Sequence, residues 1–336
     1  MDGGNLPQIL KQDHSTATPG RLSPPASGGK ESAGVKIYSH QAAALDEIVA
    51  RCRAFYGGAW SDLPIKPRFA SLLCGPTGTG KTALAAMAAE AVNAKMVRVS
   101  APAWMPCGAH NRGVAETVST LAAAISANDR TLLVIDEIDK IGYHGDNAWL
   151  GYIRGEIFDL TDRKWPNGLK SPDEASDDDD TAPVSESKWR ELLTTKLATT
   201  VFILGIGTFQ EYFDSVSNRR AIGFGATDPA DEELSAEIVA EKLPRELANR
   251  FNSSLICLPE LRPEHYRLIA NEATETLPLR MQAAFREAVA RRITGAISAK
   301  KGMRFLEEAM LDVLKTLPPA PSTAPKPDLH FDLCTL

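Results

Sequence analysis

Eight consecutive residues form a pattern typical of phosphate binding. GPTGTGKT at 75–82 matches G-x-x-x-x-G-K-[ST], and it follows an apolar segment and precedes a helical one. Its glycines allow backbone N–H groups to point at phosphate oxygens, while the lysine is expected to contact the β- and γ-phosphates and the last threonine to bind Mg²⁺. The alternative, a glycine-rich turn without a ligand, is disfavoured by this context. The expected nucleotide-binding residues are Gly75, Pro76, Thr77, Gly78, Thr79, Gly80, Lys81 and Thr82.

A second motif places two carboxylates after an apolar run. LLVIDEIDK at 132–140 ends a predicted strand in Asp136 and Glu137. Asp136 is expected to hold Mg²⁺ together with Thr82, and Glu137 to be the general base that polarises the attacking water. The two acids could instead be ordinary residues at a helix N-terminus, where negative charge is favourable. Because the phosphate loop lies upstream, the two motifs together predict hydrolysis of ATP or GTP, with ATP and Mg²⁺ as the expected cofactors.

Apolar segments and helical patterns alternate along the chain. Buried strands that alternate with helices favour a parallel sheet covered on both faces. The predicted fold class is α/β, with a parallel-sheet P-loop core and a small all-helical C-terminal lid domain. The predicted strands are 68–74, 95–99, 131–136, 199–207 and 253–258. The predicted helices are 81–93, 113–128, 147–163, 243–251, 263–275, 278–296 and 303–316.

Composition suggests where the chain divides. Both ends are rich in small polar residues and proline, and are expected to be disordered. Six acids fall in the eight residues 173–180, which indicates a solvated loop at about 166–188, with a partner-binding or Mg²⁺-attracting surface as the alternative. The expected division is a tail at 1–34, a nucleotide-binding domain at 35–260, a lid at 261–317 and a second tail at 318–336.

Charge and cysteine content narrow the class of protein. The 37 basic and 43 acidic residues leave a formal charge of −6, which argues against a dedicated nucleic-acid binder. No apolar run is long enough to predict a membrane span, and the N-terminus lacks the pattern of a secretory signal. Five widely spaced cysteines without a C-x-x-C pair predict neither a zinc ribbon nor a disulfide framework, so a cytoplasmic location is expected.

These motifs resemble those of the AAA+ ATPases, and within them the ClpX/HslU group of ATP-dependent protein unfoldases. The resemblance covers about 36–316, and IDEIDKI at 135–141 is nearly as ClpX has it. It implies a homo-oligomeric ring, hexameric in that group, that acts on a protein substrate. It also implies roles for Ile37 and Tyr38 beside the adenine, Thr208 as a polar sensor, Arg250 as an arginine finger and Arg304 as a second sensor.

The two arginines implied by this resemblance would act from different subunits. Arg250 would reach the γ-phosphate held by a neighbouring subunit, whereas Arg304 would contact the nucleotide of its own subunit from the lid. An arginine after a helix is also a common partner of the helix dipole, and Arg304 could be a plain surface residue. Rival candidates for the finger are Arg245, Arg219 and Arg220.

Some segments depart from the ClpX pattern. The tail contains no cysteine for an N-terminal zinc domain. The pore-loop aromatic of ClpX falls on Ala109, followed by His110 and Asn111, which would grip a polypeptide poorly. Trp104 lies nearby, but its position predicts a core residue. These departures weaken the case for threading of a polypeptide.

One segment favours a peptidase partner. IGFGA at 222–226 matches the ClpX loop that docks into a peptidase ring, with Ile222, Gly223 and Phe224 as the anchor. The alternative is a glycine hairpin folded against its own domain.

Three functions compete on the sequence. The leading interpretation is a ring-forming ATPase that remodels or unfolds a protein or protein complex. A nucleic-acid motor or loader is disfavoured by the net charge and because Arg112 is the only basic residue of the pore-loop segment, while phosphate contacts need Lys or Arg. The third is a nucleotide-controlled scaffold that turns over slowly.

Overall fold

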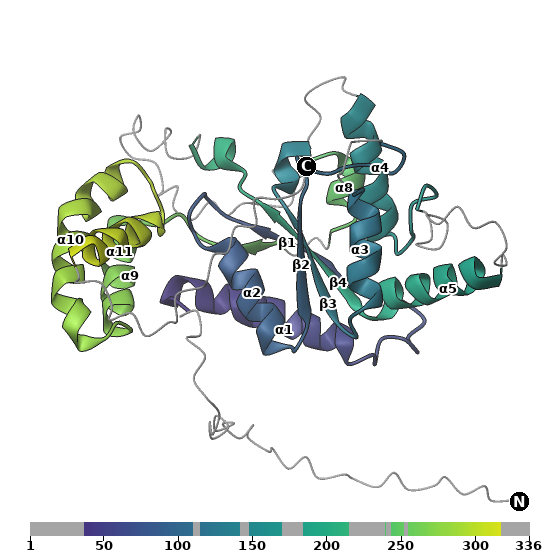
Figure 1. The fold of residues 1–336 in the computed structure, drawn as a ribbon, viewed down its shortest axis with the longest axis horizontal. Helices are drawn as coiled ribbons and strands as arrows, with labels where there is room; N and C mark the ends of the chain where they lie inside the picture. The colour runs from purple at the N-terminus through teal and green to yellow at the C-terminus, as the bar shows by residue number, and fades with distance from the viewer. Residues whose placement is uncertain are drawn as a thin grey trace, which may run out of the picture. The chain divides into compact units, whose positions relative to one another are not determined.

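The computed structural model describes residues 37–109, 115–141, 148–169, 184–214, 239, 243–251 and 255–316. The residues before the C-terminal helices form a five-stranded sheet, and all of its neighbouring strands are parallel (Figure 1). The strand order is β2-β3-β4-β1-β5. The strands are β1 (Ala70–Cys74), β2 (Lys95–Ser100), β3 (Thr131–Asp136), β4 (Val201–Gly207) and β5 (Ile256–Cys257).

The three central strands, β1, β3 and β4, are buried along their whole length. They are almost continuously apolar, as expected for strands covered on both faces. The edge strand β2 is partly exposed. The first four strands lie within two residues of their predicted ranges, whereas β5 is shorter than the predicted 253–258, since only Ile256 and Cys257 pair with β1 among the described residues.

Helices cover both faces of the sheet, because alternate strand residues point to opposite sides. Leu132 and Val134 pack with α1 and α2, while Leu133 and Ile135 pack with α3, α4 and α5. The carboxyl ends of the parallel strands meet at one edge of the sheet, which is where ligands bind in such folds. The helices are α1 (Ala42–Tyr56), α2 (Lys81–Ala91), α3 (Thr117–Ser126), α4 (Ala148–Thr161), α5 (Val184–Thr199) and the short α8 (Arg245–Ala248).

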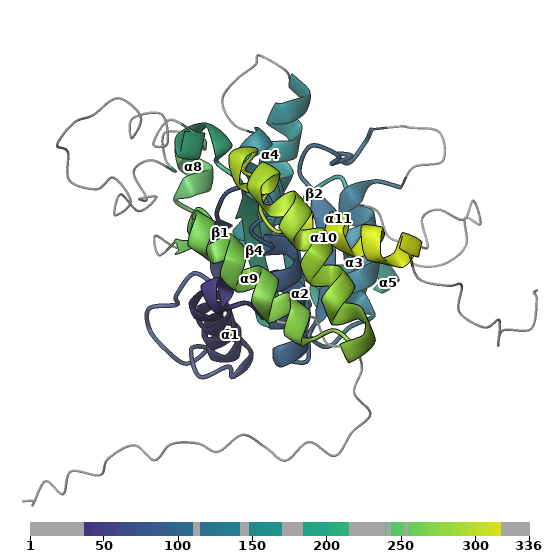
Figure 2. The same cartoon turned by 90° about the vertical axis from the view of Figure 1, so that its left-hand side faces the viewer.

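Three C-terminal helices form a core of their own, seen together in Figure 2. They are α9 (Pro263–Glu275), α10 (Leu279–Ser298) and α11 (Arg304–Thr316), and Pro263 is the first residue of α9 as its missing N–H allows. Phe285 and Phe305 are buried between them. The predicted fold class is therefore confirmed: a parallel α/β sheet with a helical C-terminal region. None of the described helices is long and apolar enough to cross a lipid bilayer.

Within the described residues, the structure adds two helices that the sequence patterns did not predict. α5 begins at Val184, inside the range expected to be loop, and buries Leu193 and Leu197 one turn apart. α1 precedes β1 and packs on α2. The prediction that Trp104 is a core residue is confirmed, since only 2% of its surface is exposed.

Several predicted features lie outside the described residues. They are the tails, the acidic block at 173–180, the pore-loop residues His110, Asn111 and Arg112, the peptidase-loop residues Ile222, Gly223 and Phe224, and the rival finger residues Arg219 and Arg220.

Candidate nucleotide-binding site

The predicted phosphate loop connects β1 to α2. α2 begins after Gly80, which has a left-handed backbone with φ of 85°, and no side chain in the described part of the chain caps this helix. The first N–H groups of α2 therefore remain available to an anion. Gly78 has φ of 80°, and a Cβ atom there would lie 2.6 Å from the carbonyl oxygen of Lys301. Only glycine fits, because the loop passes directly against the backbone that precedes α11.

Lys81 is almost completely buried under this loop. Its Nζ donates to the carbonyl oxygens of Gly75 at 2.6 Å and Pro76 at 2.8 Å. Burial lowers the pKa of Lys81 to about 8, although the carboxylates of Asp139 and Asp136 act in the opposite direction. A phosphate beside Nζ would favour the charged ammonium form. The position therefore suits a lysine that exchanges carbonyl contacts for phosphate oxygens.

Thr82 and Asp136 lie side by side at the carboxyl end of the sheet. The Thr82 hydroxyl is 3.3 Å from Asp136 Oδ2, to which it donates. Hydroxyl and carboxylate oxygens suit Mg²⁺, which usually takes only one or two protein ligands and completes its shell with water and phosphate oxygens. No cluster of three His, Cys, Asp or Glu side chains that could hold a metal occurs among the described residues. The pair thus fits an Mg²⁺ ion that is held together with a nucleotide.

The predicted general base, Glu137, is exposed next to this pair. Its backbone has φ of 57°, an uncommon left-handed conformation for a residue with a side chain. Its N–H donates to Asp136 Oδ1 at 2.9 Å, and its Oε2 accepts a hydrogen bond from the Ser100 hydroxyl at 3.1 Å. Ser100, which the sequence patterns did not identify, is the residue of β2 that pairs with Asp136 in the sheet. The contact holds the Glu137 carboxylate at the carboxyl ends of β2 and β3.

Arg98 is a second residue of β2 that the motifs did not identify. Its Nε donates to Asp136 Oδ2 at 2.9 Å, and its terminal nitrogen lies 2.7 Å from the same oxygen. Arg98 therefore supplies a direct positive partner for the carboxylate expected to hold Mg²⁺.

Thr208, the predicted polar sensor, follows the end of β4. Its hydroxyl donates to Asp139 Oδ2 at 2.8 Å, and the backbone N–H groups of Thr208 and Phe209 donate to the same carboxylate. A hydroxyl has one proton, so in this arrangement Thr208 can accept a further hydrogen bond but cannot donate one to a phosphate. The structure thus places Thr208 at the predicted strand end, with its donor already used.

Gln210 is the residue from this segment that reaches the phosphate loop. Its Oε1 accepts a hydrogen bond from the Thr77 N–H at 3.2 Å, and its Nε2 donates to Asp214 at 2.9 Å. Gln210 belongs to the GTFQ stretch at 207–210, but no pattern in the sequence indicates that Gln210, and not Thr208, contacts the phosphate loop.

Arg304, the predicted second sensor, is the first residue of α11. The preceding N–H, of Met303, donates to the Gly78 carbonyl oxygen at 2.7 Å, which fixes the start of α11 against the phosphate loop. Arg304 is exposed and makes no hydrogen bond or ion pair within the described ranges, yet it is close enough to lower the pKa of Lys81 through charge repulsion. The structure therefore brings an uncommitted guanidinium to the phosphate loop.

Arg250, the predicted finger, is placed against α4 instead. Its guanidinium makes two hydrogen bonds with the Asp162 carboxylate, at 3.1 and 2.8 Å, and donates to the Glu246 carbonyl oxygen at 2.8 Å. It also lies 4.5 Å from the centre of the Phe158 ring. The structure does not bring Arg250 to the phosphate loop of its own chain by any described contact, which is compatible with a role toward another subunit.

The predicted adenine-binding residues lie just before α1. Ile37 is 42% exposed, and Tyr38 packs on the core of the C-terminal helices. Three residues after Tyr38, Gln41 is buried and its Nε2 donates to the Thr79 carbonyl oxygen at 3.0 Å. The N-terminal segment therefore contacts both the phosphate loop and the C-terminal helices, although Gln41 was not predicted from the sequence.

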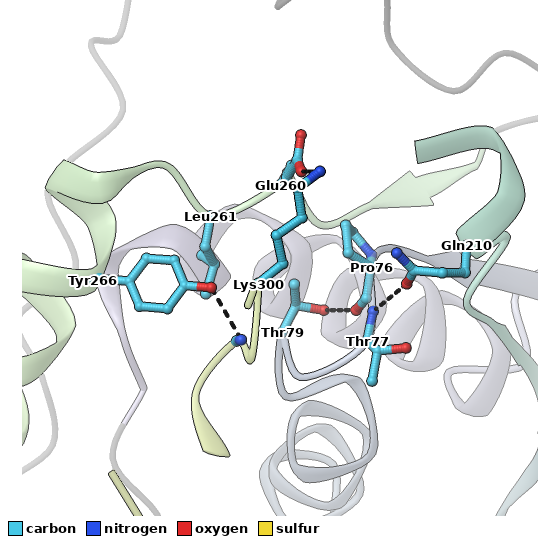
Figure 3. Close-up of a pocket in the computed structure, with 9 residues that line it drawn as sticks. Pro76, Thr77, Thr79, Gln210, Glu260, Leu261, Tyr266 and Lys300 are labelled. Carbon is cyan, nitrogen blue, oxygen red and sulfur yellow. Dashed lines mark hydrogen bonds and ion pairs between the residues drawn. The ribbon is translucent and has the colours of Figure 1, made fainter. Parts of the chain in front are cut away.

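A small pocket lies between the phosphate loop and the C-terminal helices (Figure 3). Tyr266 accepts a hydrogen bond from the Gly302 N–H at 3.0 Å on one side, and an ion pair of 2.9 Å joins Lys300 and Glu260 above it. The pocket has a volume of about 20 Å³, which is room for roughly one water molecule. As it stands, this pocket has no room for a nucleotide.

Comparison with known proteins agrees with this geometry. Residues 71–151 match the model of the ATPase family associated with various cellular activities (AAA). The matched segment includes the phosphate loop and the strand that ends in Asp136, and the match supports an ATPase of the AAA+ type, for which nucleotide binding is expected. A search of curated proteins found no match.

Proposed function

We propose that this protein binds ATP with Mg²⁺ at the carboxyl end of the sheet and hydrolyses the γ-phosphate. The observation that carries the proposal is the Thr82–Asp136 pair, whose oxygens lie 3.3 Å apart at the start of an uncapped helix. Lys81 is the first residue of this helix, and its ammonium points back toward the loop that joins the helix to β1.

In this proposal each residue has a separate task. Bound Mg²⁺ would offset the negative charge of the phosphates. Lys81 leaves its two carbonyl contacts to bind phosphate oxygens, and the N–H groups at the start of α2 bind others. Glu137, held by Ser100, accepts a proton from the attacking water.

Substitution of Glu137 by Gln tests the catalytic part of the proposal. The amide keeps the size and the contact to Ser100 but cannot accept the proton, so ATP turnover is expected to fall about 10²–10⁴-fold with little change in nucleotide affinity. Turnover is measured by phosphate release and affinity by titration of a fluorescent ATP analogue. Glu90→Gln, which removes an exposed carboxylate at the other end of α2, is the matched control. Equal turnover in wild type and Glu137→Gln would contradict the assignment.

We further propose that the active form is a homo-oligomeric ring and that it remodels or unfolds a protein or protein complex. Proteins of the AAA family typically assemble into rings. Support within the chain comes from Arg250, whose guanidinium has five N–H groups, three of which are used in the described contacts. The remaining two can face a phosphate on a neighbouring subunit without the loss of the Asp162 pair.

The substrate class is tested by stimulation of turnover. An unfolded polypeptide is expected to raise the ATPase rate of the assembled protein, while duplex DNA is expected to leave it unchanged. Stimulation by DNA alone would favour a nucleic-acid motor, and no stimulation by either would favour a slow switch. The proposed peptidase contact through Ile222, Gly223 and Phe224 is tested by co-sedimentation of wild type and Phe224→Ala with a ClpP-like peptidase.

A further inference from the structure

Strand β2 contributes one side chain to each of the two acids at the end of β3. Side chains two residues apart in a strand lie on the same face, so Arg98 and Ser100 point the same way. Ser100 contacts Glu137, and Arg98 contacts Asp136. Arg98 belongs to none of the sequence motifs, but its position makes it a direct neighbour of the proposed Mg²⁺ ligand.

The two oxygens of Asp136 have different partners. Oδ1 accepts the Glu137 N–H at 2.9 Å. Oδ2 faces Thr82 at 3.3 Å, and both contacts from Arg98, at 2.9 and 2.7 Å, go to Oδ2 as well. The oxygen that would hold Mg²⁺, or a water of its shell, together with Thr82 is therefore the oxygen that the guanidinium occupies.

Mg²⁺ and this guanidinium would compete for the same oxygen. A divalent ion next to Thr82 also repels a positive charge that lies against the same carboxylate. The Arg98 side chain is 53% exposed, whereas that of Asp136 is only 10% exposed. Arg98 can therefore withdraw into solvent when the ion binds, while Asp136 stays in place between its backbone contact and Thr82.

We propose that Arg98 is a positioning residue that holds Asp136 in the metal-free protein and sets the Mg²⁺ concentration at which the nucleotide site fills. The inference rests on the proposed function, because it concerns the same metal-binding pair. In the absence of nucleotide, Arg98 neutralises Asp136 and disfavours a lone Mg²⁺ ion. When Mg²⁺ arrives with ATP, the phosphate oxygens supply the further ligands that allow it to displace the arginine.

The test is an Mg²⁺ titration of nucleotide binding by Arg98→Gln. The protein is mixed with a fluorescent, non-hydrolysable ATP analogue, and the Mg²⁺ concentration at half-maximal binding is measured. Removal of one positive charge beside the ion is expected to lower this midpoint by about three- to tenfold. Binding, not turnover, is the readout, so loss of activity for another reason does not affect it.

Two further variants make the result specific. Lys95→Gln removes the same charge from the same strand, about 10 Å away at its other end, and its midpoint is expected to equal that of wild type. Arg98→Lys keeps the charge but cannot place two donors on Oδ2, so its midpoint is expected to lie between those of wild type and Arg98→Gln. Melting temperatures without nucleotide establish whether the three variants are folded. If Arg98→Gln is not folded, the midpoint of Arg98→Lys is compared with that of wild type instead.

The outcomes separate this inference from the function on which it rests. A midpoint for Arg98→Gln that equals that of Lys95→Gln, or that moves to higher Mg²⁺, would overturn competition by Arg98 while leaving the ATP site intact. A wild-type protein that binds no nucleotide at any Mg²⁺ concentration would overturn the proposed function itself.

Discussion

The two arginines predicted to meet ATP lie in contrasting surroundings. Arg250 follows α8 and is held against α4 by a two-bond contact to Asp162 and by the Phe158 ring. Arg304 begins α11 beside the phosphate loop. Its side chain makes no hydrogen bond or ion pair within the described ranges, and its charge repels that of Lys81.

This contrast indicates two ways to use a guanidinium. A side chain that must meet a ligand on another subunit benefits from fixed geometry, because its conformational entropy is lost before the ligand arrives. A side chain that senses the nucleotide of its own subunit benefits from being unrestrained. When it contacts the nucleotide, the side chain moves, and the helix that it starts can move with it. We therefore expect Arg250 to act on turnover between subunits and Arg304 to act on nucleotide affinity within one.

The largest expected effect is the loss of turnover in Arg250→Ala. If Arg250 is the finger, its removal leaves the charge that develops on the γ-phosphate without a partner from the next subunit. Turnover is then expected to fall about 10³-fold or more, with little change in nucleotide affinity. Arg250→Lys is expected to fail as well, since an ammonium cannot make the two-bond contact to Asp162.

A mixture of two inactive variants tests whether Arg250 acts on the nucleotide of a neighbouring subunit. Arg250→Ala keeps Glu137, and Glu137→Gln keeps Arg250, so a mixture of the two inactive proteins is expected to regain part of the turnover if both enter one ring. A mixture that stays inactive, although mass measurement shows mixed assemblies, would place the Arg250 role within its own subunit.

A smaller effect is expected for Arg304→Ala. The lost contact is one hydrogen bond between charged groups, so affinity for ATP is expected to fall about ten- to hundredfold. Arg280→Ala removes an exposed arginine from α10 and is the matched control. Because Arg304 is expected to act on its own nucleotide, its affinity defect should persist in mixtures with Glu137→Gln. Unchanged affinity would make Arg304 a surface residue.

The smallest effect is a fraction of a proton taken up with ATP. Burial lowers the pKa of Lys81 to about 8, so part of it is neutral between pH 8 and 9, and phosphate binding is expected to recharge it. Calorimetry in buffers of different ionisation enthalpy measures this uptake. Arg304→Ala is expected to reduce it, because the removal of a repelling charge raises the pKa of Lys81, whereas Arg250→Ala is expected to leave it unchanged. Equal proton uptake in both variants would contradict the inference that Arg304, but not Arg250, lowers the pKa of Lys81.

The same lysine has a consequence for stability. Its pKa in the folded state, about 8, lies below the ordinary value of 10.5, so the unfolded chain binds more protons between these values. The contribution of Lys81 to stability is therefore expected to increase as pH rises from about 8 to 10.5, and to be smallest below that window. Denaturation curves of wild type and Lys81→Met over this range isolate the effect.

The sequence by itself determined the features that arise from neighbouring residues. The glycines at 75–80 and the apolar run before Asp136 have local physical meanings, a tight loop and a buried strand, and both elements were predicted correctly. The three C-terminal helices were also predicted within two residues, because their apolar residues recur with helical spacing. α5 escaped prediction because it follows an acidic segment and presents few apolar residues.

The tertiary structure alone decided which distant side chains meet at the site. Arg98 contacts Asp136 across 38 positions of sequence and Gln210 reaches Thr77 across 133, and neither pair has a local pattern. The hydrogen bonds of Arg250 to Asp162 join residues 88 positions apart, and no local sequence pattern predicts them either. The physical reason is that strand order and register set these contacts: β2 lies beside β3, and β4 beside β1, so residues far apart in the chain end at the same edge of the sheet.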